Sequence, residues 1–358
     1  MSRNGVHAAI RMAYRHQRKV MLVASRGQVE CEELGGGYVE RWFTEAFTHY
    51  VRERDPDGLV AVCRDHGGPW QHPDEVPSPN STADVLRRTL VSLRADIRAG
   101  MELIHLDTSR EGPREADFDI ALSRLVELYR ECHDYAHSLS RQVLFEVGLE
   151  RQGGDVDDPE QFQGKLERIV DALAAATLPP PTFVVGQTGT HVMGTENRGV
   201  LAQEPETVAE VVAQLAHSCW RHGLALKAHN ADYLPDRAIV ELLRSGTDAV
   251  NIAPEFGVTE TQAMLALLEE LGLARERERF LTLAFESGAW RKWFDEEAGD
   301  LERAVAAGHY VFSTSEFRDI KNRAEQACQP RGVTVDDVLG RALDRRMERY
   351  AGIVWAAG

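Results

Sequence analysis

The sequence has no long hydrophobic run and has fewer basic than acidic residues. No apolar stretch approaches the roughly 18 residues of a membrane-spanning helix, and residues 1–18 lack the apolar segment of a signal peptide. The 41 Lys and Arg residues face 57 Asp and Glu residues, which gives a formal net charge of -16. A chain this acidic is a poor candidate for holding nucleic acid or an anionic membrane by general charge, although a local basic pocket can still hold an anionic small molecule.

Cysteine is also scarce. The five cysteines are odd in number, widely scattered and without a Cys-x-x-Cys pair; they are Cys31, Cys63, Cys132, Cys219 and Cys328. This usage argues against a cysteine zinc site and indicates a reducing, cytoplasmic location. No Gly-x-Gly-x-x-Gly follows the first apolar segment, which disfavours a dinucleotide-binding Rossmann domain.

The pattern that is present alternates short apolar segments with amphipathic ones. The apolar segments, rich in Val, Leu and Ile, predict buried strands at 19–25, 58–63, 101–107, 142–148, 182–187, 223–229 and 247–253. The amphipathic segments predict helices at 39–52, 82–99, 116–139, 161–176, 205–221 and 235–244. Such alternation predicts an α/β fold with a parallel sheet.

Seven strands favour a (β/α)8 TIM-type barrel, or a barrel that lacks its first strand. After residue 273 the alternation stops and the remaining segments read as helices. We therefore predict a barrel domain at 1–272 and a helical C-terminal extension at 273–358.

Barrel enzymes build their active sites at the C-terminal ends of the strands. Polar residues whose side chains can act as acids, bases or ligands stand where the predicted strands end. They are Arg64, Asp65, His66, His105, Asp107, Glu146, Thr190, His191, Lys227, His229, Asn230 and Asn251.

Three of these histidines suggest a metal site. A lone histidine at a strand end is more often structural, but His66, His191 and His229 would all face one mouth of a barrel. Three nitrogen ligands with an open position are typical of catalytic zinc, so we expect Zn²⁺ or another divalent metal. Asp65, next to His66, is placed to move a proton on a bound substrate.

Two further acids stand at strand ends, and several roles are open to them. Asp107 and Glu146 could hold a second ion, orient a histidine or position substrate hydroxyls, and capping of a following helix is an equal alternative. His133 and His137 lie four apart on a predicted covering helix, where a solvated surface role is favoured.

Several segments together resemble a known family. They are Gly36-Gly37-Tyr38, Asp65-His66-Gly67-Gly68-Pro69, Ile104 to Ser109, Val147 to Glu150 and Ala228 to Tyr233. Over roughly residues 8–272 the chain resembles the accessory-subunit family of tagatose-bisphosphate aldolase (GatZ/KbaZ-like), within the class II, metal-dependent aldolases.

The resemblance implies a (β/α)8 barrel and a set of site roles. Asp65 would be the acid/base, with His66, His191 and His229 as zinc ligands. Asp107, Glu146, Asn230 and Asn251 would bind substrate. The chain departs from the family pattern at Pro254, where a Thr would bind phosphate, and at Asp232, whose charge would repel one.

The function expected from these features is a class II aldolase reaction. It would make or break a C–C bond in a ketose or ketose phosphate through a zinc-stabilised enediolate. The alternatives are a ketose 4-epimerase that uses retro-aldol and aldol steps, and a non-catalytic accessory subunit that stabilises a partner tagatose-bisphosphate aldolase. The expected partners are a small sugar or sugar phosphate and either further copies of this chain or a partner aldolase subunit, with no nucleic acid or membrane.

Overall fold

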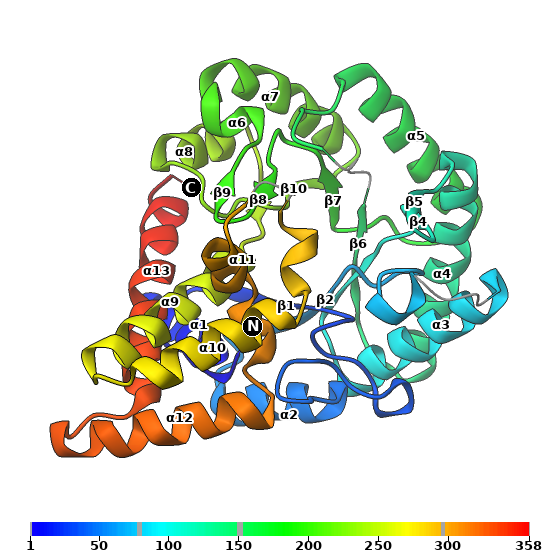
Figure 1. The fold of residues 1–358 in the computed structure, drawn as a ribbon. Coiled ribbons are helices and arrows are strands. Elements are labelled where there is room, and N and C mark those ends of the chain that lie inside the picture. Colours follow the sequence, from blue (N-terminus) through cyan, green and yellow to red (C-terminus); the bar gives the residue numbers. More distant parts are fainter. Residues whose placement is uncertain (1, 77–80, 149–152, 295–297, 358) are drawn as a thin grey trace.

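The central element is a seven-stranded parallel sheet that curls into a half-barrel (Figure 1). The structure, a computed structural model, describes residues 2–76, 81–148, 153–294 and 298–357. The strands, in spatial order, are β1 (Val20–Ser25), β2 (Val60–Asp65), β3 (Leu103–Leu106), β6 (Leu144–Gly148), β7 (Phe183–Gly186), β10 (Ala225–Ala228) and β11 (Ala249–Val250). Each lies within or next to a predicted strand, and spatial order follows chain order, as in a barrel.

Helices cover the outer face of the sheet. They are α2 (Thr44–Arg54), α3 (Thr82–Ala99), α4 (Phe118–Ser138), α5 (Pro159–Ala175), α6 (Val200–Gln203), α7 (Pro205–Arg221) and α8 (Asp236–Arg244). The helix that follows the last strand, α9 (Pro254–Glu270), packs with the C-terminal helices instead. The ends of α3 follow from local chemistry, because the Ser81 hydroxyl accepts a hydrogen bond from the Asp84 amide and Gly100 closes the helix with a φ of 87°.

One predicted helix begins later than expected. The segment 39–52 becomes helical only at Thr44, because Glu40 and Arg41 both have a φ of 52° in the left-handed region. That conformation interrupts a right-handed helix, and residues 39–43 form a turn instead.

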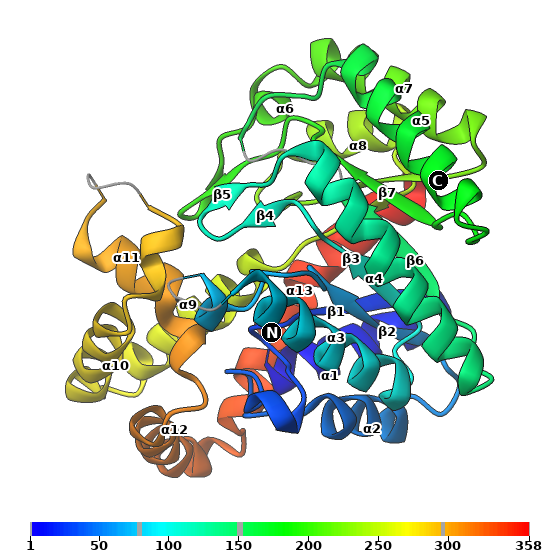
Figure 2. The same ribbon diagram turned by 90° about the vertical axis from the view of Figure 1, so that its right-hand side faces the viewer.

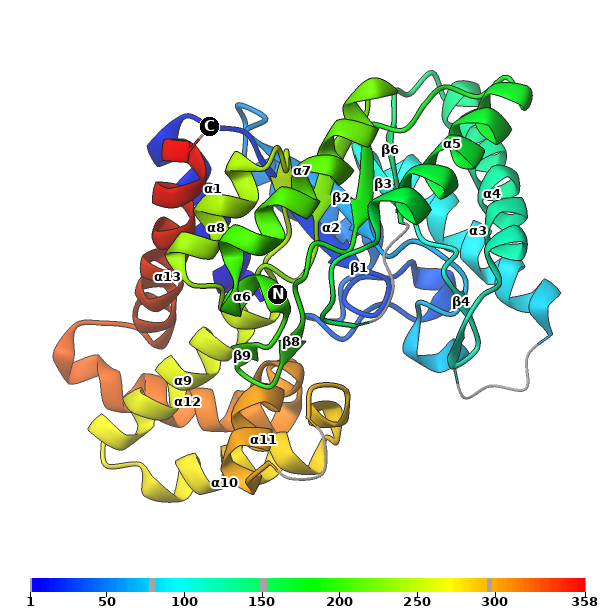
Figure 3. The same ribbon diagram turned by 90° about the horizontal axis from the view of Figure 1, so that it is seen from above.

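Two short hairpins were not predicted from the sequence. β4 (Arg110–Glu111) pairs with β5 (Arg114–Glu115), and β8 (Val192–Met193) pairs with β9 (Glu196–Asn197). Two-residue strands are too short to show an alternating pattern. Both hairpins follow sheet strands and extend from the same end of the molecule as α10–α12 (Figure 3).

The C-terminal part is helical, as predicted. It contains α10 (Ala274–Glu286), α11 (Asp300–Ala307), α12 (Ser315–Cys328) and α13 (Val335–Ala357), and the described residues beyond 250 include no strand. Met264, Phe280 and Phe317 belong to a separate core of this part. Figure 2 shows α10, α11 and α12 to one side of the sheet, while α13 returns to it.

The helix α13 joins the two ends of the chain. Leu343 and Met347 pack against Ala8 and Ala9 of α1 (Arg3–His16), and Tyr350 belongs to the core under the sheet. Because α9 and α13 each contribute to more than one core, the boundary at residue 272 stays a prediction.

The sheet is open between its first and last strands. β1 and β11 are the two edges, and a hollow of about 330 Å³ lies between them, also lined by residues of α1 and α13. The described part of the chain holds no helix long and apolar enough to cross a membrane.

Buried ion pairs fix the loops beside β1 and β2. Arg64 pairs with Asp96 through two contacts of 2.7 Å, and Arg26 pairs with Glu30 and Glu75, all with 0% side-chain exposure. Arg64, a strand-end candidate in the sequence, therefore points outward to α3 and takes a structural place.

Candidate metal centre

Four side chains from four strands meet at one end of the half-barrel. Asp65 ends β2, His105 lies on β3, Glu146 lies on β6 and His229 follows β10. One ligand atom from each lies within 4.8 Å of the others. Strand alternation produces this meeting, because the outward neighbours Ile104, Phe145 and Ala228 belong to the core beneath the helices.

Glu146 is the most heavily contacted member of the group. Its Oε1 lies 3.2 Å from His229 Nε2 and 3.6 Å from His105 Nδ1, and its Oε2 accepts a 2.6 Å hydrogen bond from Lys227 Nζ. Asp65 Oδ1 lies 3.5 Å from His105 Nδ1 and 3.9 Å from His229 Nε2. Glu146, His105 and His229 are almost fully buried.

A second pair, His66 and Asp107, borders this group. His66 Nδ1 lies 2.6 Å from Asp107 Oδ2, while its Nε2 lies 3.8 Å from Asp65. The His66 ring is 5.1 Å from that of His105 and 5.3 Å from that of His229, between centroids. The His66 side chain is 32% exposed, so it is the imidazole of the three that solvent or a substrate can reach.

Hydrogen bonds hold Asp107 in place. Gln71 donates to its Oδ2 over 2.7 Å, and the Ser109 hydroxyl donates to its Oδ1 over 2.5 Å. With both oxygens engaged, Asp107 fixes the orientation of the His66 ring.

The close packing of two loops requires glycine at two positions. A Cβ on Gly68 would lie 1.5 Å from the Asp107 carbonyl oxygen, and one on Gly67 would lie 2.7 Å from that of His105. These glycines allow the loop after β2 to contact the end of β3.

The electrostatics of the group favour ionised carboxylates. Burial opposes this, but neighbouring imidazoles hold the pKa values of Asp65 and Asp107 well below their usual range. Burial is likewise outweighed at Glu146, where His105 and Lys227 lower the pKa to about 2. For His66, burial disfavours the charged ring, yet Asp65 and Asp107 raise its pKa to about 9.

The donor set fits a divalent metal ion. Two imidazoles and two carboxylates match the ligands of Zn²⁺, Mn²⁺ or Fe²⁺. Three ionised carboxylates (Asp65, Asp107, Glu146) outnumber the cationic groups Lys227 and His66, so the group carries excess negative charge that attracts a divalent cation. His105 directs Nδ1 into the group, 3.5 Å from Asp65 Oδ1, where it also accepts a 3.3 Å hydrogen bond from the His66 backbone amide. Its Nε2 has no hydrogen-bond partner among the described residues.

Comparisons with solved structures identify proteins of similar fold. No protein-family model matches the sequence, and a comparison with curated proteins found no match. A probable tagatose 6-phosphate kinase from Sinorhizobium meliloti 1021 is similar over 99% of this chain and 97% of its own, with a TM-score of 0.76 and 18% identity. A fructuronate-tagaturonate epimerase from Cohnella laeviribosi (TM-score 0.51, 13% identity) covers 85% of this chain and 70% of its own.

A fructose-bisphosphate aldolase from Campylobacter jejuni is similar over 97% of this chain and 87% of its own, with a TM-score of 0.50 and 13% identity. The chain shares its fold with this aldolase and with the two proteins above. This confirms, as a likeness of fold, the resemblance found in the sequence.

Within the aldolase-like fold, His191 does not join the described group. It directly precedes the β8–β9 hairpin, where its backbone amide donates to Asn197 and its carbonyl accepts from Arg198. Its Cβ lies beside Gly154. The neighbouring Thr190 contacts the group instead. Its hydroxyl donates a 2.8 Å hydrogen bond to the backbone carbonyl of His229.

The two predicted asparagines lie at the same end of the sheet but outside the group. Asn230 is exposed, with a φ of 56°, and its carbonyl accepts from Asn197 Nδ2. Asn251 lines the hollow between β1 and β11. The predicted surface pair His133 and His137 lies on α4, with His133 Nδ1 beside Asp134.

The structure places two residues in or beside the candidate group that received no role from the sequence, His105 and Lys227. Both were noted at strand ends, but neither received a role. The signal was available in the alternation, because His105 pairs in register with Glu146 and Lys227 precedes His229 by two residues. The segment Val147 to Glu150, used in the resemblance, lies partly outside the described residues, at Leu149 and Glu150.

Proposed function

We propose that this protein is a divalent-metal-dependent enzyme that makes or breaks a C–C bond in a ketose or ketose derivative, as an aldolase or a ketose epimerase. The observation that carries the proposal is the buried set of four donors at the ends of four strands. The aldolase-like fold supports it, because active sites of this architecture gather at that end.

The proposed ligands are Asp65, His105, Glu146 and His229. A divalent ion held there would supply Lewis-acid polarisation of a substrate carbonyl. This set differs from the one proposed from the sequence, where His66 and His191 were ligands and Asp65 was the acid/base. We infer the exchange of roles from distance, since Asp65 lies within the group of four and His66 lies beside it.

His66 is the proposed proton-transfer residue. Asp107 holds the Nδ1 atom of His66, which leaves Nε2 as the ring nitrogen that a substrate can reach. From there the ring can take a proton from a substrate hydroxyl as the adjacent C–C bond breaks, and return it when the bond forms again. A nearby cation would lower the pKa of His66 from about 9 toward neutrality.

An aldolase and a 4-epimerase share the bond-breaking step. They differ in whether the fragments leave or recombine through the other face, which the same residues can serve. Phosphoryl transfer fits less well, because it uses Mg²⁺ on oxygen ligands and substrate phosphates rather than buried imidazoles.

We also propose that the half-barrel is a (β/α)8 barrel with one strand missing. The open edges of β1 and β11, with α1 and α13 beside the hollow, support this.

All five cysteines are free and buried, which fits the proposed cytoplasmic setting.

The test is a screen of ketoses and ketose phosphates with the protein supplied with Zn²⁺ or Mn²⁺. Nuclear magnetic resonance would follow release of an aldehyde or inversion at C4. We expect turnover by the protein alone, lost in His105→Ala and retained in His133→Ala, which alters an exposed histidine. Activity that appears only after a second aldolase chain is added would contradict the proposal and favour the accessory-subunit alternative.

A further inference from the structure

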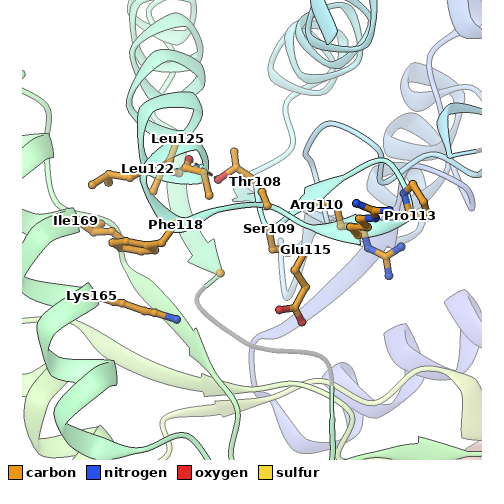
Figure 4. Close-up of a pocket in the computed structure, with 14 residues that line it drawn as sticks. Thr108, Ser109, Arg110, Pro113, Glu115, Phe118, Leu122, Leu125, Lys165 and Ile169 are labelled. Carbon is orange, nitrogen blue, oxygen red and sulfur yellow. Dashed lines mark hydrogen bonds between the residues drawn. The ribbon is translucent and has the colours of Figure 1, made fainter. Parts of the chain in front are cut away.

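A basic pocket opens beside the candidate metal centre. It has a volume of about 140 Å³ and lies between the β4–β5 hairpin, α4 and α5 (Figure 4). Phe118 and Ile169 form part of its apolar wall, and Lys165 reaches into it from α5.

The charges of this pocket are opposite to those of the chain. Among its described lining residues, Lys165, Arg110 and Arg114 are basic and Glu115 is the one acid, in a protein of net charge -16. None of these three bases forms an ion pair with another residue in the described ranges. Lys165 Nζ lies 5.6 Å from the Phe118 ring centroid, which leaves its hydrogen-bond donors available.

The pocket shares two walls with the site. Ser109, which lines it, donates to Asp107 and thereby supports the His66 ring. Gly148, at its inner side, is so close to His105 that an added Cβ would lie 2.9 Å from Nε2. The pocket is therefore adjacent to the residues that surround the candidate metal centre.

The usual anion position in a barrel is filled by a side chain here. Phosphates often bind at a helix N-terminus beyond the seventh or eighth strand. In this chain the N-terminus of α9 is occupied, because Asp232 Oδ1 accepts 2.9 Å hydrogen bonds from the amides of Ala253 and Glu255. A second anion at that position would meet the buried carboxyl groups of Asp232 and Glu255.

We propose that the substrate carries an anionic group, a carboxylate or a phosphate, that binds in this pocket to Lys165 with Arg110 and Arg114. The inference rests on the proposed function for the identity of the rest of the substrate. It makes the substrate an acidic ketose, held by its anionic end in a pocket adjacent to the candidate metal centre.

The experiment measures binding of three probes by calorimetry at one fixed ionic strength: inorganic phosphate, D-glucuronate and neutral D-fructose. We expect at least one of the two anions to bind, and the tighter one identifies phosphate or carboxylate as the source. Lys165→Gln should weaken that binding about tenfold, the effect of losing one charge-assisted hydrogen bond.

The matched control is Arg168→Gln. Arg168 lies on the same helix and also over Phe118, at 4.9 Å, but it pairs with Asp119 and does not line the pocket. Its variant should bind the anion as the wild type does. Failure of both anions to bind, or equal binding by Lys165→Gln and wild type, would overturn the inference.

A further variant separates this inference from the proposed function. Glu146→Gln should lose the metal but keep the anion affinity, because Glu146 does not line the pocket. If the wild type binds the anion but no metal, the proposed function is contradicted and the pocket inference is not. Metal binding without anion binding would contradict the pocket alone.

Discussion

Replacing Glu146 with glutamine removes the charge at the centre of the proposed site while preserving the shape of the side chain. Glu146 contacts Lys227 at 2.6 Å and His229 at 3.2 Å. In Glu146→Gln the Lys227 ammonium, which is 1% exposed, loses its counter-charge. Breaking a buried ion pair by removing one partner costs about 3–5 kcal/mol. We therefore expect the melting temperature of the metal-free protein to fall by roughly 5–10 °C.

The double variant Glu146→Gln/Lys227→Met separates stability from metal binding. Methionine fills similar space without a charge, so this variant should recover most of the lost stability. It should still bind no metal, because the carboxylate ligand is gone. The assays are thermal unfolding after chelation and elemental analysis after metal is supplied. A Glu146→Gln protein that melts within about 1 °C of wild type and retains its ion would refute the reasoning.

Three further predictions concern neighbouring residues. His66→Asn should retain the metal and lose turnover; loss of the ion instead would make His66 a ligand. Because the folded pKa of His66 lies above the ordinary value of 6.5, its stabilising effect is complete below pH 6.5 and is lost as pH rises through about 9. The stability of the metal-free protein should therefore fall across this window, and Asp107→Asn should flatten the fall; identical profiles would contradict the pairing. Asp96→Ala leaves Arg64 buried without its partner and should cost about 3–5 kcal/mol in urea unfolding; a loss below about 1 kcal/mol would mean that the pair is not buried in solution.

The strands were predictable because most of them are largely buried and are therefore rich in Val, Leu and Ile. Helix bounds were predictable where capping residues stand, as at Ser81 and Gly100 for α3. The start of α2 was not, because nothing in the composition of residues 39–43 signals the left-handed conformations of Glu40 and Arg41. The two hairpins are too short to carry a period.

The site was predictable in its location but not in all of its members. Asp65, Glu146 and His229 were selected because they stand at strand ends. His105 was noted at a strand end but received no role, although it lies in register with Glu146 of β6 and on the same side of the sheet. His191 was selected because it follows a strand, but the chain turns into a hairpin there, and sequence spacing does not show where that turn directs the ring.

The most direct test of the proposed metal centre compares His105 with His191. Elemental analysis of the purified wild type, His105→Ala and His191→Ala, each supplied with zinc, measures the ion content per chain. The account predicts about one divalent ion per chain in the wild type and in His191→Ala, and loss of the ion in His105→Ala. Loss from His191→Ala with retention by His105→Ala, or no ion in the wild type, would contradict it.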